Sequence, residues 1–381
     1  MEGRKTCAPT EPETETGHLT ETELRVRIRD AIGKGGTCDM FDGNRMDGMK
    51  LSRRDAFKLA GAAGLMAAVP WGGVSEAVAA PPALKGPQAG GYYRFAIGEI
   101  EAVVISDGGV SFQPIQPNWA PEATKEELEG ALRTAFLPTD RINLDINTLL
   151  LSIGGEVILV DSGAGGLFGP SLGKVRERME AAGIRPAQVT GVVLTHAHGD
   201  HFGGLLDGEG KPVYPNANYF ASKTEVDFWT GSDPDFSRLR IPKERRDQAL
   251  AGARKYIAAI KDRLTPVAPG QKIMEGMEVV SAPGHTPGHI ALLVTSGKEA
   301  LLNSADTIHH HVLMFAHPGW TSAFDVDPKL GAETRRKILE RAAGDGLRIL
   351  GYHLPFPGIG HVRTAKGGAF EWVPEPWRWT T

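Results

Sequence analysis

Thiol groups are almost absent from this 381-residue sequence. The only two cysteines, Cys7 and Cys38, lie near the N-terminus, so a disulfide framework is excluded for the rest of the chain. A metal ion bound there must use histidine or carboxylate side chains, because no thiolate is available.

An excess of basic residues is also absent. The sequence has 42 Lys and Arg against 46 Asp and Glu, and its formal net charge is −4. A nucleic-acid partner is therefore not expected, because such proteins carry a basic excess on one face. With 41% hydrophobic and 23% charged residues, the composition is that of a soluble globular protein, large enough for one large domain or two modest ones.

The apolar stretch near the N-terminus is too weak for a membrane span, because Pro70 and several glycines interrupt it. Residues 1–48 are polar and aperiodic, which predicts a disordered or non-native extension. Residues 49–80 have a basic start at Arg53-Arg54, a Gly/Ala-rich middle and a final AVA, the layout of a cleavable secretory signal. The paired arginines resemble a twin-arginine export signal, so we expect a periplasmic or secreted protein with no membrane span in its mature form.

From about residue 90 the pattern changes to short strands and amphipathic helices. Two hairpins are predicted, one at 92–109 with a turn near Gly98 and one at 147–163 around Gly154-Gly155. The order of the elements predicts two packed sheets with helices outside, in one domain over residues 90–381. The other expected elements are helices at 171–182, 242–262 and 328–343, strands at 191–195, 278–282, 289–295, 299–304 and 346–353, and a proline-rich loop at 113–140.

One short segment concentrates side chains that bind metal ions. The sequence THAHGDH places His196, His198, Asp200 and His201 directly after the apolar run GVVL. His196 and His198 alternate, so both can point to one side of an extended chain end. Gly199 is expected to turn the chain sharply, which would direct Asp200 and His201 to a second ion. This density of ligand-type residues after a strand predicts a metal site.

Three later residues are candidates for the remaining ligands. His285 in PGHTPGH, Asp306 at the end of LLNSAD and His353 at the end of RILGYH all follow predicted strands, where loops carry functional groups. His289, in the same turn as His285, is expected to make a structural hydrogen bond. Two neighbouring ions can share a bridging hydroxide of near-neutral pKa. The set therefore predicts a hydrolase that needs no serine or cysteine nucleophile.

These stretches together resemble the metallo-β-lactamase superfamily. THAHGDH, the DSG at 161–163, GHTPGH, Asp306 and His353 are similar to its five successive motifs, over roughly residues 90–365. LVDSGAGGLFGPSLG and HLPFPGIGH are similar to the methyl parathion hydrolase group, which includes lactonases. The resemblance implies a four-layer αββα sandwich with the metal ions at one edge between the sheets.

The resemblance also implies a role for each candidate residue. Two divalent ions, zinc foremost, would be bound per chain, Asp306 would bridge them, and Asp200 and Asp306 would tune their charge. Asp161 would brace the metal loop from outside the ligand set, whereas Phe168 and Trp229 would line the substrate pocket. One ion would be held by His196, His198 and His285, and the other by Asp200, His201 and His353.

The predicted activity is hydrolysis of a small lactone, aryl ester or phosphotriester. A thioester hydrolase of the glyoxalase II type shares the ligand set and stays an alternative. A non-catalytic metal-binding module is a further alternative, although structural zinc sites are closed and usually rich in thiolate. Of the run His309, His310 and His311, one imidazole can reach the metals and two are expected at the surface. The resemblance also allows a homodimer.

Met49 is expected to be the native start, with residues 1–48 as an upstream extension of the reading frame. N-terminal sequencing of the unprocessed precursor should then begin at Met49 or directly after it. A precursor that begins at residue 2 or 3 would show that the prediction is wrong.

Overall fold

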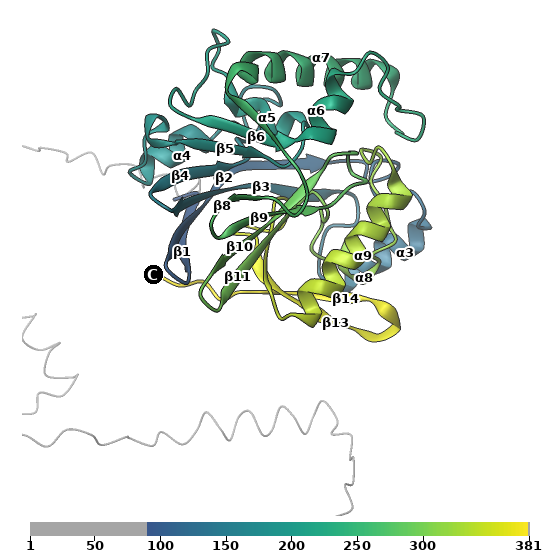
Figure 1. Ribbon diagram of the computed structural model, residues 1–381. Coiled ribbons are helices and arrows are strands. Elements are labelled where there is room, and N and C mark those ends of the chain that lie inside the picture. Colours follow the sequence, from purple (N-terminus) through teal and green to yellow (C-terminus); the bar gives the residue numbers. More distant parts are fainter. Residues whose placement is uncertain (1–89, 380–381) are drawn as a thin grey trace, which may run out of the picture. The chain divides into compact units, whose positions relative to one another are not determined.

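Two β-sheets stacked face to face form the centre of the molecule (Figure 1). The computed structural model describes residues 90–379, and in this part of the chain each sheet has seven strands. The first sheet has the order β1-β2-β3-β4-β5-β6-β7, antiparallel up to β4 and parallel from β4 to β7. The second has the order β14-β13-β12-β11-β10-β9-β8 and is antiparallel except for the pair β11 and β12.

The strands of the two sheets are mostly short, with long antiparallel strands only at β2 and β3. Those of the first sheet are β1 (Tyr92–Ile97), β2 (Ile100–Phe112), β3 (Ile142–Ile153), β4 (Glu156–Val160), β5 (Gly191–Leu194), β6 (Asn218–Ser222) and β7 (Leu264–Val267). Those of the second sheet are β8 (Lys272–Met274), β9 (Met277–Ser281), β10 (Ile290–Ser296), β11 (Glu299–Ala305), β12 (Arg348–Gly351), β13 (Ile359–Thr364) and β14 (Phe370–Pro374).

Helices cover the outer faces of both sheets (Figure 1). Helices α4 to α7 pack on the first sheet, whereas α3, α8 and α9 lie beside the second. This arrangement confirms the predicted four-layer αββα sandwich. The helices are α3 (Lys125–Thr134), α4 (Val175–Ala181), α5 (Gly199–Phe202), α6 (Lys223–Thr230), α7 (Lys243–Ile260), α8 (Leu313–Ala316) and α9 (Pro328–Gly344).

Apolar side chains fill the space between the two sheets. Val104 and Leu149 from the first sheet and Leu292 and Leu301 from the second have no exposed surface and belong to one buried cluster. Side chains alternate between the two faces of a strand. Each sheet therefore has a second apolar face, which the helices cover.

Local sequence explains the long helices. In α7, Ala253, Tyr256, Ile257 and Ile260 recur at helical spacing and are all buried, so this charged helix has one apolar stripe. Helix α9 begins after Asp327, whose side chain accepts a hydrogen bond from the backbone N–H of Leu330, as expected for an N-cap.

The structure also differs from the predicted elements in several places. The loop expected at 113–140 contains α3, which starts at a capping box formed by Thr124 and Glu127. The helix expected at 171–182 begins only at Val175. Gly173 has φ +79°, and a Cβ there would lie 2.1 Å from the backbone oxygen of Gly165, so a tight loop replaces the first turn. The strand near 346–353 is not the last, because β13 and β14 follow it.

The predicted extension at 1–48 and the predicted export signal at 49–80 lie outside the described residues. The described residues all belong to one compact unit. Within the described part of the chain, no helix has the length and apolar character needed to cross a membrane.

Candidate metal centre

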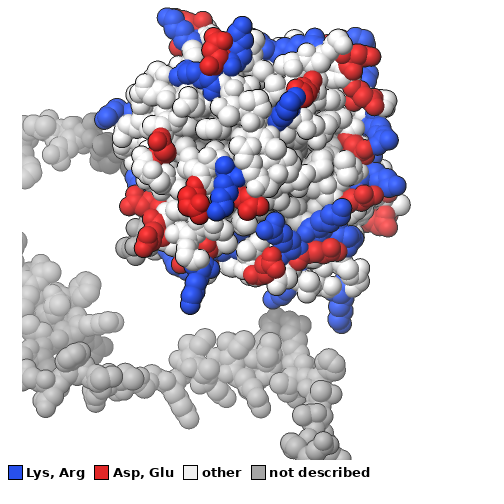
Figure 2. All heavy atoms as spheres, in the orientation of Figure 1, with Lys and Arg blue, Asp and Glu red and all other residues white. Residues whose placement is uncertain are grey.

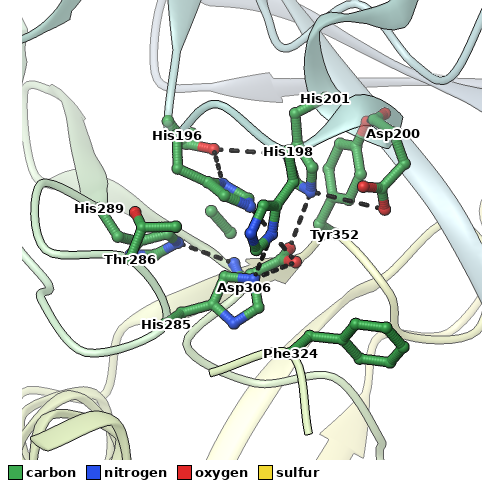
Figure 3. Close-up of polar contacts among 12 residues, drawn as sticks. His196, His198, Asp200, His201, His285, Thr286, His289, Asp306, Phe324 and Tyr352 are labelled. Atoms are coloured by element: carbon green, nitrogen blue, oxygen red, sulfur yellow. Dashed lines mark hydrogen bonds and ion pairs between the residues drawn. The ribbon is translucent and has the colours of Figure 1, made fainter. Parts of the chain in front are cut away.

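The candidate ligands meet at one edge of the sandwich, where strands of both sheets end (Figure 3). Strand β5 runs directly into Thr195 and His196, and the short helix α5 begins at Gly199 and carries Asp200 and His201. The second sheet supplies three further candidates from the loops after β9, β11 and β12. These are His285, Asp306 and His353.

A single carboxylate, Asp306, lies at the centre of the cluster and is 3% exposed. Burial disfavours its ionised form, but the imidazoles of His201, His353 and His309 hold the pKa of Asp306 well below its usual range. Asp306 is therefore ionised. Its carboxylate oxygens lie 3.1 Å from Nε2 of His201, 3.2 Å from that of His353, 3.3 Å from those of His285 and His309, and 3.8 Å from that of His196.

Three overlapping groups of side chains in the cluster are each compact enough to hold a cation. Two of them contain all the predicted ligands, and the third combines His285 and Asp306 with His309. Within a group, one ligand atom per residue lies within 4.8 Å of the others. Asp306 belongs to the second group but also contacts His196 and His285, so it connects the two groups. The first group is His196, His198 and His285, and the second group is Asp200, His201, Asp306 and His353.

Several buried polar atoms in these groups have no hydrogen-bond partner among the described residues. They are Nε2 of His196, Nε2 of His201 and Oδ1 of Asp306, the last two 3.1 Å apart without hydrogen-bond geometry. Nε2 of His285 and Nδ1 of His198 face each other at 2.9 Å. Unpaired buried polar atoms are costly, and imidazoles with carboxylate oxygens are donors that Zn²⁺ binds. The residues therefore fit a divalent metal ion.

Two of the three histidines in the first group are in the form that suits a metal ion. Burial, together with the neighbouring imidazoles, holds the pKa of His196 and that of His198 well below the usual range. A histidine must be neutral to bind a metal ion. Both side chains are thus in the metal-binding form near neutral pH. At His285 burial lowers the pKa, but the carboxylates of Asp306 and Asp325 outweigh it and raise the pKa to about 9.

Two of the ring nitrogens that face away from the cluster, those of His201 and His285, are fixed by carboxylates. Nδ1 of His201 lies 2.9 Å from Oδ2 of Asp161, which also accepts from the hydroxyl of Thr195. Nδ1 of His285 lies 2.8 Å from Oδ1 of Asp325. Such contacts orient a ring and decide which nitrogen is free to bind metal. The family resemblance implies Asp161 in this position, whereas nothing in the sequence FDVDP distinguishes the carboxylate of Asp325.

Two further residues at the cluster, Tyr352 and Glu225, are not predicted from the sequence. Tyr352 donates its hydroxyl to the backbone oxygen of Asp200 at 2.7 Å, and its ring stacks on His201 with centroids 3.8 Å apart. Glu225 on α6 is buried behind the first group and accepts a hydrogen bond from Ala197. Neither residue belongs to a recognisable motif, and their role depends on long-range contacts.

Backbone strain occurs beside the cluster. Asp161 has φ +59° and Ala305 has φ +44°, left-handed values that are uncommon for residues other than glycine. Ala305 directly precedes Asp306, at an irregularity in the pairing of β11 with β12. Strained residues persist where the surrounding structure holds them, and they concentrate at functional sites.

For the remaining histidines, one prediction from the sequence is confirmed and one is wrong. His289 makes structural hydrogen bonds, as predicted: its Nδ1 lies 2.8 Å from the backbone oxygen of Ala282, and its Nε2 accepts from the backbone N–H of Asp306. The expectation of two surface histidines in the triple run is wrong, because His309 and His310 are 2% and 3% exposed. His310 is buried where its Nδ1 accepts backbone N–H groups at the start of α8.

The predictions that Trp229 lines an open pocket and that Gly199 turns the chain sharply need correction. Trp229 is 1% exposed, and its ring lies 5.8 Å from that of His198, so it is a buried neighbour of the cluster instead of an open wall. Phe168 is 56% exposed and packs against Gly199. Gly199 starts α5 without a positive φ, so close packing explains the glycine here. A Cβ at Gly199 would lie 3.0 Å from the ring of Phe168.

One segment matches the pattern of a serine nucleophile by its letters alone. Residues 169–173 read GPSLG, the G-x-S-x-G pattern of a nucleophile elbow. That motif requires a turn between a strand and a helix, with the serine beside a histidine. Ser171 instead lies exposed in the loop between β4 and α4. The letters alone do not indicate a serine hydrolase.

Fold and site together define a class of protein, an αββα sandwich with a histidine- and aspartate-lined metal site between the sheet edges. Residues 142–353 match the family model of the metallo-beta-lactamase superfamily. The chain therefore belongs to the metallo-β-lactamase superfamily, as its motifs predict. The narrower resemblance to the methyl parathion hydrolase group stays a prediction.

Solved structures and a curated sequence show the same relationship. The structure of AidC, a dizinc quorum-quenching lactonase in complex with a product, is 32% identical with a TM-score of 0.73, covering 76% of this chain and 98% of that one. The hydrolase AbOPH is 32% identical with a TM-score of 0.69, covering 77% and 100%. A probable metallo-hydrolase of Mycobacterium tuberculosis is 28% identical over 191 residues, 44% of this chain and 58% of that relative. The match thus spans little more than half of the curated relative.

Replacing Asp161 by Asn should destabilise the metal-free protein, most strongly at acidic pH. Burial lowers the pKa of His201, but the carboxylates of Asp306, Asp161 and Asp200 raise it well above its usual range. A raised folded-state pKa stabilises the fold below about pH 6.5, the unfolded value, and this contribution is lost as the pH rises through the folded-state pKa. The variant should lose about 1.5–3 kcal/mol at low pH.

Urea unfolding of chelator-treated protein across pH checks this expectation. The difference between wild type and Asp161→Asn should shrink as the pH rises. A difference that is constant or grows with pH would contradict the assigned role of Asp161.

Proposed function

We propose that this protein is a dinuclear metal-dependent hydrolase that opens the ester bond of a small lactone. One ion would be held by the first group and the other by the second, with Asp306 shared between them. Zinc suits these nitrogen and oxygen donors. The observation that carries the proposal is the pair of compact ligand groups connected by one buried carboxylate, with unpaired ligand atoms in both.

The chemistry required of the protein follows from this arrangement. Two bound divalent ions supply Lewis acidity and lower the pKa of a water molecule to near neutral. The chain's own residues supply orientation, because Asp161 and Asp325 fix the rings of His201 and His285. His309, with Nε2 3.3 Å from Asp306, adds an imidazole beside the shared carboxylate.

Aromatic side chains around the cluster favour a substrate with an apolar portion. Phe168 is exposed beside the start of α5. Phe324 lies on another side of the cluster (Figure 3), and its ring is 5.7 Å from that of Trp119, which in turn lies 5.0 Å from the ring of His309. In Figure 2 acidic and basic side chains are interspersed on the viewed face, which does not resemble the one-sign surface that attracts a polyanion.

The likeness to a dizinc lactonase over nearly all of that chain supports a lactone as the substrate. Aryl esters, phosphotriesters and thioesters are the other bonds that the same ligand set can serve. The likeness to the hydrolase AbOPH supports hydrolysis without specifying the bond.

Replacing Asp306 by Ala should abolish hydrolysis while the fold survives. Both ions lose a ligand at once, so kcat/KM should fall by more than about 100-fold, beyond the usual effect of a residue that only supports a ligand. Steady-state kinetics with excess Zn²⁺, together with circular dichroism, measures both properties. Asp345→Ala, at an exposed acid after α9, is the matched control and should keep wild-type activity. Wild-type turnover in the Asp306 variant would contradict the shared role.

A substrate panel distinguishes the proposed activity from the alternatives. We expect kcat/KM to be highest for an acyl-substituted γ-lactone, compared with a nitrophenyl ester, a diethyl aryl phosphotriester and a glutathione thioester. Chelation should remove the activity, and Zn²⁺ should restore it. A preference for the thioester would favour the glyoxalase II type. Two bound ions without hydrolysis of any of the four would favour a metal-binding module.

A further inference from the structure

Helix α6 places a fully buried carboxylate between two loops of the candidate metal centre. Glu225 lies in the first turn of this helix and is 2% exposed. Every group that hydrogen-bonds to its carboxylate is a neutral donor, so no cationic side chain balances it among those contacts. A buried carboxylate is tolerated only when its oxygens are well satisfied.

The four donors come from both sides of the first ligand group. Oε1 accepts from the backbone N–H of Ala197 at 2.8 Å and from Nε1 of Trp229 at 2.7 Å. Oε2 accepts from the hydroxyl of Thr286 at 2.6 Å and from the backbone N–H of Gly288 at 3.0 Å. One side chain therefore holds two loops that belong to different sheets.

Both loops carry ligands of the first group. Ala197 lies between His196 and His198, and Thr286 directly follows His285 in its turn (Figure 3). The distance between the two loops decides whether the three imidazoles can reach one ion. Glu225 contacts the backbone or side chain next to each ligand without touching the ligand itself.

The turn that carries His285 is also pressed against the start of α6. A Cβ on Gly288 would lie 2.1 Å from the backbone nitrogen of Glu225 and 2.5 Å from its Cα. Glycine at this position therefore allows the turn to approach the helix backbone directly. The hydrogen bonds to Glu225 and this close approach fix the turn in the same place.

We propose that Glu225 is a positioning residue for the first metal ion, setting the spacing between the His196/His198 loop and the His285 turn. The inference rests on the proposed dinuclear site and assigns the geometry of one half of it to helix α6. It requires a carboxylate, because three of the four partners are N–H groups that can only donate and they address both oxygens.

Replacement of Glu225 by Gln tests this requirement with almost no change in shape. The amide oxygen should face Ala197 and Trp229, since both present N–H groups that cannot accept a hydrogen bond. The amide NH₂ then faces Thr286, whose hydroxyl can reverse its role, and Gly288, whose N–H cannot. E225Q should therefore loosen the His285 turn and leave the His196/His198 loop in place.

Cobalt(II) titration of the metal-free full-length protein, followed by visible absorption and calorimetry, gives the affinity of each ion. We expect E225Q to weaken one of the two ions by about 10–100-fold, the range known for residues that support metal ligands. The other ion should keep its wild-type affinity.

The weakened ion can be located with single-site backgrounds. In a His353→Ala background, E225Q should weaken the ion that remains at the first group. In a His285→Ala background it should have no further effect. D161N should show the opposite pattern and weaken the ion at the second group, because Asp161 supports His201 of that group.

Asp107→Asn is the matched control for loss of a buried carboxylate. Asp107 has no exposed surface and accepts backbone N–H groups of Ala164, Gly173 and Val175, none of which is a candidate ligand. D107N should lower stability and leave both metal affinities unchanged.

Three results would overturn the inference: wild-type affinity for both ions in E225Q, equal weakening of both ions, or the same weakening in D107N. The proposed function fails differently, through a wild-type protein that binds two ions and hydrolyses nothing in the panel. Such a protein would still show the selective effect of E225Q, so the two failures are distinguishable.

Discussion

A carboxylate removed from water and encircled by imidazoles is the constraint on which the rest of this structure depends. Asp306 is almost fully buried, and five imidazole nitrogens lie within 3.8 Å of its oxygens. A buried charge is stable only when nearby groups compensate it. Those imidazoles come from both sheets, so strands of both sheets must end at the same edge. The strained backbone at Ala305 accompanies that requirement.

Three further buried carboxylates hold the candidate ligands in place. Asp161 and Asp325 each fix one imidazole through its outer nitrogen, whereas Glu225 fixes the backbone of two ligand loops. These three carboxylates act differently, yet each is buried and accepts more than one hydrogen bond. Orientation of the ligands is thus distributed over α6, the end of β4 and the segment before α9.

The sequence predicts the fold and the gathering of the candidate ligands because both depend on local patterns. Short apolar strands followed by His and Asp place candidate ligands at strand ends, and every one of them arrives at the cluster. Residues whose role depends on long-range packing are not predictable in this way: no motif marks Asp325, the histidine run suggests two surface residues, and Trp229 is expected as a pocket wall. In each case burial, which depends on the whole fold, decides the outcome. Helix α3, by contrast, is missed although its start is a local pattern: the capping box of Thr124 and Glu127 can be recognised in the sequence alone.

The division of the ligands between the two sheets has a mechanical consequence. Under the proposed function, an ion held by His196 and His198 from one sheet and His285 from the other would join the two halves of the sandwich. Separating the sheets would then require release of the ion, so the free energy of binding would add to the free energy of unfolding. Metal supply would in that case set the resistance of this protein to heat and denaturant as well as its capacity for chemistry.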